Sequence, residues 1–210
     1  MPAGLKGCHV LLTGASGGIG LETAQKLLHE GAQVTLHYSA RVKPLGELLD
    51  RFPETAFAVQ AVAQEEDDVK RAFDEAVSHF GTVHVLIANH AVFPPDNVPL
   101  KDMSVAQFRL TLDINLTGVF LFTREWMRHL EKALIERQET LTNVNCILIG
   151  STSGTFGEAG HVDYSCSKSA MMYGFCRTLK NELPQLVPNS RVNVVAPGWV
   201  LTPMAESRLS

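Results

Sequence analysis

Cysteine is scarce, and no two cysteines have Cys-x-x-Cys spacing. The four that occur among the 210 residues are Cys8, Cys146, Cys166 and Cys176. Scattered in this way, they predict reduced thiols in a cytoplasmic protein. The eight histidines form no His-Glu-x-x-His or comparable pattern, so no metal site is predicted.

Neither sign of charge is in large excess, because 18 Lys and Arg stand against 22 Asp and Glu, a net charge of −4. The sequence therefore lacks the excess of basic residues that binding to nucleic acid or to an anionic membrane would require. No uncharged apolar run reaches the roughly 18 residues that a membrane span needs, and the N-terminus lacks a signal-peptide pattern. With 45% hydrophobic and 19% charged residues, the composition is that of an ordinary globular protein.

Short apolar runs alternate with longer amphipathic segments along the chain. The runs predict strands at residues 9–13, 33–37, 57–61, 83–88, 144–149 and 191–195. The amphipathic segments predict helices at 18–29, 44–51, 65–80, 105–110, 113–136 and 161–183, with the polar stretch 131–143 extending the long helix and its exit loop. This alternation predicts an α/β fold: one domain over residues 1–210, with a doubly wound, Rossmann-type parallel sheet and right-handed crossovers.

A glycine-rich turn, Thr13-Gly-Ala-Ser-Gly-Gly-Ile-Gly20, separates the first strand from the first helix. Glycine is needed where the backbone bends sharply and where a pyrophosphate must come close. The helix behind the turn offers N–H groups and its positive dipole end to the phosphates. Glycines also end strands for purely structural reasons, but this placement favours dinucleotide binding.

Tyr164 and Lys168 are four residues apart, on one face of a predicted helix. A phenol with a pKa near 10 is a poor acid–base catalyst at neutral pH, and a neighbouring ammonium lowers that pKa. Two exposed helix residues are the alternative interpretation. Ser151 favours catalysis, because it follows the strand at 144–149, at the edge where a parallel sheet forms its active crevice, and its hydroxyl would bond a substrate carbonyl. Ser153 is a rival by position.

The glycine spacing, Gly-x-x-x-Gly-x-Gly, is one residue wider than the common Rossmann form. Together with Tyr164-Ser-Cys-Ser-Lys168, Ser151 and the segment Asp113-Ile-Asn-Leu-Thr-Gly118, it resembles the short-chain dehydrogenase/reductase family, over residues 5–204. The resemblance implies a catalytic group of Asn115, Ser151, Tyr164 and Lys168, in which Asn115 holds a water that connects Lys168 to solvent. Without the resemblance, an Asn inside a helix would more often be a local cap.

The resemblance also implies where a nicotinamide dinucleotide binds. The phosphates would lie over the glycine turn, and the Val200 backbone and Thr202 hydroxyl would hold the carboxamide. A plain Pro-Gly turn accounts for Pro197 and Gly198 but not for Thr202. The expected cofactor-binding residues are Gly14, Ser16, Gly18, Ile19, Gly20, Ser39, Arg41, Asn89, Tyr164, Lys168, Pro197, Gly198, Val200 and Thr202.

The sequence departs from the family's pattern at three places. Ala88-Asn-His-Ala91 stands where the family has Asn-Asn-Ala-Gly, which leaves support of the ribose open. His90 either faces the cleft or is satisfied locally, and we favour the second. Val62 replaces an Asp that contacts the adenine, so backbone contacts and packing would hold that ring. The sequence ends at Ser210, before the family's final helix and strand, as a naturally short or an incomplete chain.

The end of the second strand, Thr35-Leu-His-Tyr-Ser-Ala-Arg41, has no acidic residue. An Asp or Glu there would bond both ribose hydroxyls and select NAD. Ser39 and Arg41 instead fit a 2′-phosphate, with Arg as a bidentate fork. Gly17 argues the other way, because many NADP-using relatives have a basic residue there. We predict NADP(H), with NAD as the alternative.

These observations predict an oxidoreductase that transfers a hydride between NADP(H) and a small-molecule ketone or secondary alcohol, with Tyr164 as acid or base. The alternative is a non-catalytic nucleotide-binding relative with a regulatory or scaffolding role. A partly apolar substrate pocket is predicted from Phe93, Pro94, Ser153, Phe156 and Met204. The resemblance also implies a homodimer, because relatives associate through their two long mid-chain helices, which correspond here to 113–136 and 161–183.

Overall fold

The computed structural model describes residues 4–202 and has at its centre a six-stranded parallel sheet. The strand order is β3-β2-β1-β4-β5-β6. The strands are β1 (His9–Leu12), β2 (Gln33–Tyr38), β3 (Ala56–Gln60), β4 (Val85–Ala88), β5 (Asn145–Ile149) and β6 (Arg191–Val195). The order reverses between β1 and β4, which confirms the predicted doubly wound arrangement.

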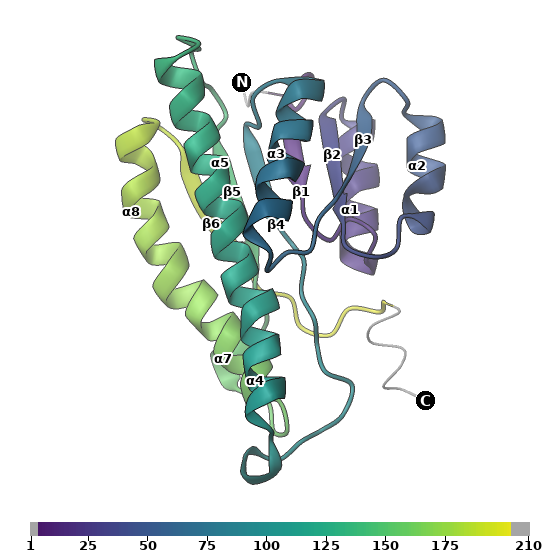
Figure 1. Cartoon of the computed structure of the whole chain (residues 1–210), viewed down its shortest axis with the longest axis vertical. Coiled ribbons are helices and arrows are strands. Elements are labelled where there is room, and N and C mark those ends of the chain that lie inside the picture. Colours follow the sequence, from purple (N-terminus) through teal and green to yellow (C-terminus); the bar gives the residue numbers. More distant parts are fainter. Residues whose placement is uncertain (1–3, 203–210) are drawn as a thin grey trace.

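Helices cover both faces of the sheet (Figure 1). One face carries α1 (Gly18–His29) and α2 (Gly46–Arg51), and the other carries α3 (Glu66–Phe80), α5 (Gly118–Ile135) and α8 (Cys176–Leu186). Two apolar clusters correspond to these layers. Ala24, Leu28 and Leu48 pack on the α1–α2 side. Phe73, Phe122 and Leu183 pack on the other side, so each face of the sheet is buried under its own core.

The predicted break between helices 105–110 and 113–136 is wrong. Helix α4 (Val105–Leu112) continues through the π-helical turn η3 (Asp113–Thr117) directly into α5. Thr111 lies in the supposed break, but it is buried, and its hydroxyl donates to Asp163 at 2.8 Å. This tertiary contact stabilises helical backbone where the local sequence favours an end. Single-turn π-helical segments are frequent at functional sites.

The helix predicted at 161–183 is α7 (Val162–Ser169), a second π-helical segment η4 (Ala170–Phe175) and α8. It runs past Pro184 to Leu186, because Leu183 is fully buried and Leu186 packs beside it against the same core. Two short elements were not predicted, η2 (Leu100–Asp102) and α6 (Ser153–Phe156), while η1 (Lys43–Leu45) lies mostly within the helix predicted at 44–51.

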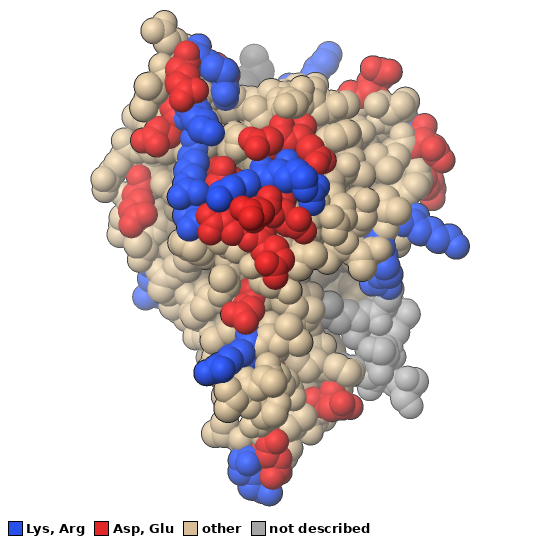
Figure 2. All heavy atoms as spheres, viewed as in Figure 1, with Lys and Arg blue, Asp and Glu red and all other residues tan. Residues whose placement is uncertain are grey.

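Acidic and basic side chains intermingle over α3 and α5 (Figure 2). Glu66 pairs with Lys70 and with Arg124, and Arg71 pairs with Asp68. No field of one sign therefore forms on this face. No helix in residues 4–202 is long and apolar enough to cross a membrane. All four cysteines lie in this range and are free.

Candidate active site

A cleft of about 480 Å³ opens at the carboxyl ends of the strands, where the strand order reverses. Open α/β sheets bind their ligands at this position. Asn115 alone among the predicted catalytic and cofactor-binding residues lies off the cleft wall. The wall contains all the others: Gly14, Ser16, Gly18, Ile19, Gly20, Ser39, Arg41, Asn89, Ser151, Tyr164, Lys168, Pro197, Gly198, Val200 and Thr202.

The predicted apolar lining is only partly correct. Phe93 and Ser153 belong to the wall, but Pro94 does not. Phe156 is 83% exposed, because the short α6 ends there and turns the side chain outward. Met204 lies outside the described residues.

The glycine turn is a cradle that side chains would fill. Gly14 has a φ of 62°, and a Cβ there would lie 2.8 Å from the Cα of His90. A Cβ at Gly20 would press against the carbonyl oxygen of Gly14. Asn89 braces the turn by donating from Nδ2 to the carbonyls of Thr13 and Gly14, each at 3.0 Å.

Helix α1 begins directly behind this cradle. Its N-cap residue, Gly17, makes no side-chain capping hydrogen bond. The first N–H groups of a helix have no acceptor within the helix itself, so those of α1 are left to bind an anion. The glycines leave room for a ligand to approach the backbone, and the first N–H groups of α1 can donate to it. Together these features fit a dinucleotide pyrophosphate.

Two buried histidines support the turn from behind. His37 Nδ1 accepts from the Gly14 N–H at 3.1 Å, so its Nε2–H donates to the carbonyl of Ala61 at 3.0 Å. His90 uses Nδ1 with the Thr13 hydroxyl at 2.8 Å and Nε2 with the carbonyl of Ile114 at 3.1 Å. Burial lowers the pKa of His37 to about 4 and that of His90 to about 3, so both rings are neutral at pH 7. His90 is therefore hydrogen-bonded at both ring nitrogens, as favoured, and it also belongs to the cleft wall.

Tyr164, on α7, is half-buried and hydrogen-bonded to Ser151. The Ser153 N–H donates to Ser151 Oγ at 3.1 Å, while the Ser153 hydroxyl donates to Glu158. Ser151, rather than Ser153, therefore bonds the tyrosine. Lys168 is buried one helical turn further on, where its Nζ donates to the carbonyl of Ile149 at 2.7 Å and lies 5.7 Å from the centre of the Tyr164 ring.

Burial dominates the titration of this group. It raises the pKa of Tyr164, which the hydrogen bond from Ser151 only partly offsets. Burial also lowers the pKa of Lys168 to about 8. Lys168 is not among the causes of this shift in the pKa of Tyr164, and its ammonium donates to the Ile149 carbonyl instead of the phenol.

Asn115 is fully buried in the π-helical turn and is not a helix cap. Its Oδ1 accepts from the Val92 N–H at 2.8 Å, and its Nδ2 donates to the Val92 carbonyl at 2.9 Å and to Ser167 Oγ at 3.2 Å. These bonds connect the loop after β4 to α7, the helix that carries Tyr164 and Lys168.

Sequence reasoning missed the buried Asp163, which positions α7. Its carboxylate accepts from the Tyr164 N–H at 2.8 Å, from the Thr111 hydroxyl at 2.8 Å and from Gln107 Nε2 at 3.2 Å. The available signal was an acidic residue in the first turn of a helix, where the dipole favours it. Glu158, in the cleft wall, was also missed, although it lies between the two predicted catalytic residues Ser151 and Tyr164 in the sequence.

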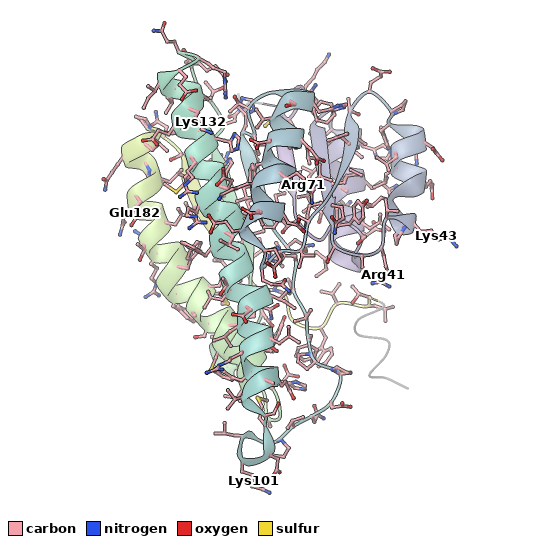
Figure 3. The ribbon with its side chains drawn as sticks, viewed as in Figure 1. Arg41, Lys43, Arg71, Lys101, Lys132 and Glu182 are labelled. Atoms are coloured by element: carbon pink, nitrogen blue, oxygen red, sulfur yellow. The ribbon has the colours of Figure 1, made fainter. Side chains whose placement is uncertain are left out.

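The other end of the cleft is formed by the ends of β2 and β3. Ser39, Arg41, Val62 and Gln64 line it. Arg41 shares the cleft wall with Val200 and Thr202, whereas Lys43 is not part of it and extends outward in Figure 3. No carboxylate lines this end in the described part of the chain.

The parallel sheet and the cleft at its switch point define a Rossmann-type α/β nucleotide-binding protein. The chain belongs to the short-chain dehydrogenase family, whose model, described as short chain dehydrogenase, matches residues 8–210. It is an NAD(P)-dependent oxidoreductase.

Two curated relatives illustrate the similarity. A cis-4-hydroxycyclohexanecarboxylate dehydrogenase of Sinomonas cyclohexanicum is 32% identical over 92% of this chain and 74% of its own length. A 3-oxoacyl-[acyl-carrier-protein] reductase of Synechocystis is 33% identical over 94% of this chain and 76% of its own. The crystal structure of a 3-ketoacyl-(acyl-carrier-protein) reductase from Brucella melitensis, complexed with NADH, superimposes with a TM-score of 0.84 at 24% identity, covering 97% of this chain and 80% of that one.

Proposed function

We propose that this protein interconverts ketones and secondary alcohols with NADP(H), and that Tyr164 is its general acid or base. One observation carries the proposal: Tyr164, its hydrogen-bonded partner Ser151 and the buried Lys168 share one cleft with the glycine turn. Its curated relatives are named as a hydroxy-acid dehydrogenase and an oxoacyl reductase, which supports chemistry at a carbonyl carbon.

The residues present fit a nicotinamide dinucleotide. Gly14, Gly18, Ile19 and Gly20, with Ser16, would hold the pyrophosphate. Pro197, Gly198, Val200 and Thr202 would hold the nicotinamide, and Asn89, Tyr164 and Lys168 would contact the ribose. When bound, the cofactor supplies or accepts the hydride.

The chain's own residues handle the proton. In reduction, the hydroxyls of Ser151 and Tyr164 donate hydrogen bonds to the substrate oxygen, and the Tyr164 proton passes to that oxygen as the alcohol forms. The raised pKa of Tyr164 keeps the phenol protonated and suits this acid role. We propose that Lys168 and a water held by Asn115 then return a proton to Tyr164.

The preference for NADP(H) rests on the cleft end near β2. Ser39 and Arg41 are exposed there, and a guanidinium suits the doubly charged 2′-phosphate. An acidic side chain would repel that phosphate, and none lines this end among the described residues.

The alternative is a nucleotide-binding relative without catalysis. The test measures NADPH oxidation with a panel of ketones and NADPH binding by fluorescence on the same preparation. We expect both turnover and binding. Binding without turnover across the panel would favour the alternative, and absence of binding would overturn both.

We also propose a cytoplasmic homodimer. The free cysteines support the location. A groove between α5 and α8, with Phe120, Met127, Phe175 and Leu179 in its wall, supports self-association. A two-fold interface buries the same patch on both copies.

A further inference from the structure

Glu158 is the only carboxylate in the cleft wall among the described residues. It is half-buried in the connection between α6 and α7. The Ser153 hydroxyl donates to its Oε2 at 2.5 Å, while Oε1 has no hydrogen-bond partner within residues 4–202. The carboxylate is therefore held in place and retains one oxygen to bind a ligand.

Glu158 belongs to the catalytic end of the cleft. Its partner Ser153 also donates, through the backbone N–H, to Ser151 Oγ at 3.1 Å, and Ser151 bonds Tyr164. The charge of Glu158 is felt at the phenol, where it contributes to the raised pKa of Tyr164. A substrate whose carbonyl lies at Tyr164 therefore has a negative charge close to its remaining part.

Aromatic rings border the same region. The Phe93 ring lies edge-on to Tyr164 with centroids 4.5 Å apart, and it is 6.5 Å from the ring of Trp199. Trp199 is 71% exposed, so much of its surface is open to a ligand. Faces of Trp, Tyr and Phe attract cations, and aromatic cages are a common way to bind quaternary ammonium groups.

The cleft wall also has two basic residues, Arg41 and Lys168. Arg41 lies at the opposite end, beside Ser39 and Gln64. Lys168 is buried, and its ammonium donates to the Ile149 carbonyl.

From this arrangement we propose that Glu158 is a specificity-determining residue that selects ketones and alcohols carrying an organic cation, an ammonium or quaternary amine, and rejects anionic ones. The proposal rests on the proposed function, because it assigns a substrate class to the same site. Under this proposal the chain prefers a substrate of opposite charge to the one in the name of its relative, a hydroxycyclohexanecarboxylate, which is an anion.

The test uses three ring ketones that differ in the charge of one substituent: 4-(trimethylammonio)cyclohexanone, its neutral isostere 4-tert-butylcyclohexanone, and 4-oxocyclohexanecarboxylate. We expect kcat/KM with NADPH to be about ten-fold or more higher for the cation than for the isostere, from Coulomb attraction to Glu158 and contact with the aromatic rings, and lowest for the anion. In Glu158→Gln, which keeps an acceptor for Ser153, the cation-to-isostere ratio falls towards one. Glu54→Gln removes the same charge from an exposed loop position and leaves the ratio unchanged.

A second measurement is independent of turnover. Calorimetry gives the affinities of the three ketones for NADPH-loaded Tyr164→Phe protein, with and without Glu158→Gln. The same order of affinity, lost with Glu158→Gln, supports the proposal. Equal affinities, no measurable binding of the cation, or a preference that persists in Glu158→Gln overturns it.

The two proposals fail in different ways. Turnover of the neutral isostere without any charge preference retains the proposed function and overturns the role of Glu158. A charge preference in binding, with no turnover of any ketone by the unmodified protein, retains the role of Glu158 and overturns the proposed catalysis.

Discussion

The backbone N–H of Gly14 donates to Nδ1 of His37 at 3.1 Å, so the first bend of the glycine turn is held by a side chain from β2. The same ring donates from Nε2 to the carbonyl of Ala61, just beyond the end of β3. One neutral imidazole therefore ties the turn to both outer strands on that side of the sheet.

Replacing His37 by Ala should loosen the turn. The change leaves the partly buried Gly14 N–H without its acceptor, which costs about 1 kcal/mol of unfolding free energy, and we expect weaker NADPH binding as well. Urea unfolding and NADPH titration measure the two effects. His37→Asn, whose Oδ1 can stand in for Nδ1, should recover much of both, and equal losses in the two variants would contradict this role.

Stability should decline steeply in mild acid. Burial lowers the pKa of His9 and His37 to about 4 and that of His90 to about 3, against about 6.5 in an unfolded chain. The unfolded state thus binds more protons below pH 6.5, so unfolding free energy falls as pH drops from 6.5 towards 4, by roughly 3 kcal/mol per histidine at pH 4.

Urea unfolding at pH 8, 6.5 and 5 measures this decline. His37→Asn should show a smaller decline, whereas His29→Gln, at an exposed position, should decline like the unmodified protein. A free energy that is flat between pH 8 and 5 would show that these rings are not buried neutral.

Tyr164→Phe should lower kcat by about 10²–10⁴-fold while NADPH affinity stays nearly constant, because one hydroxyl and almost no volume is lost. Lys168→Ala should lower kcat further and should also weaken NADPH binding, since it removes a proposed ribose contact as well. Steady-state kinetics and NADPH titration separate the two. A Tyr164→Phe protein that keeps most of its activity would contradict the assignment of Tyr164 as the acid or base.

Arg41→Ala should weaken NADPH binding more than NADH binding. A lost charge-assisted hydrogen bond is worth roughly 1.5–3 kcal/mol, about ten-fold or more in affinity. Lys43→Ala is the matched control, because Lys43 extends away from the cleft (Figure 3). Equal losses for the two cofactors would make NAD the better assignment.

Met127→Glu should convert the proposed dimer into a monomer, because it buries a charge in the apolar part of the α5–α8 groove. Sedimentation velocity at several concentrations gives the distribution. Leu100→Glu, at an exposed apolar residue on η2, should leave the dimer intact. A monomeric unmodified protein would refute the interface.

The sequence by itself determined the sheet, the glycine turn and the Tyr164–Lys168 pair. These features arise from short-range physics: side-chain periodicity, glycine where the backbone must approach closely, and i, i+4 spacing on a helix. For the same reason, strand positions were predicted to within about two residues.

Only the tertiary structure decided which serine bonds Tyr164. Ser151 and Ser153 are both plausible by sequence position, but the fold places Ser151 at Tyr164 and Ser153 at Glu158. The helix continues through Thr111 because Asp163, 52 positions away, supplies its hydrogen-bond partner. No sequence pattern around His37, Asp163 or Glu158 marks them as part of the site. Their roles come from groups that the parallel sheet brings together at its carboxyl edge, and local periodicity contains no information about such long-range contacts.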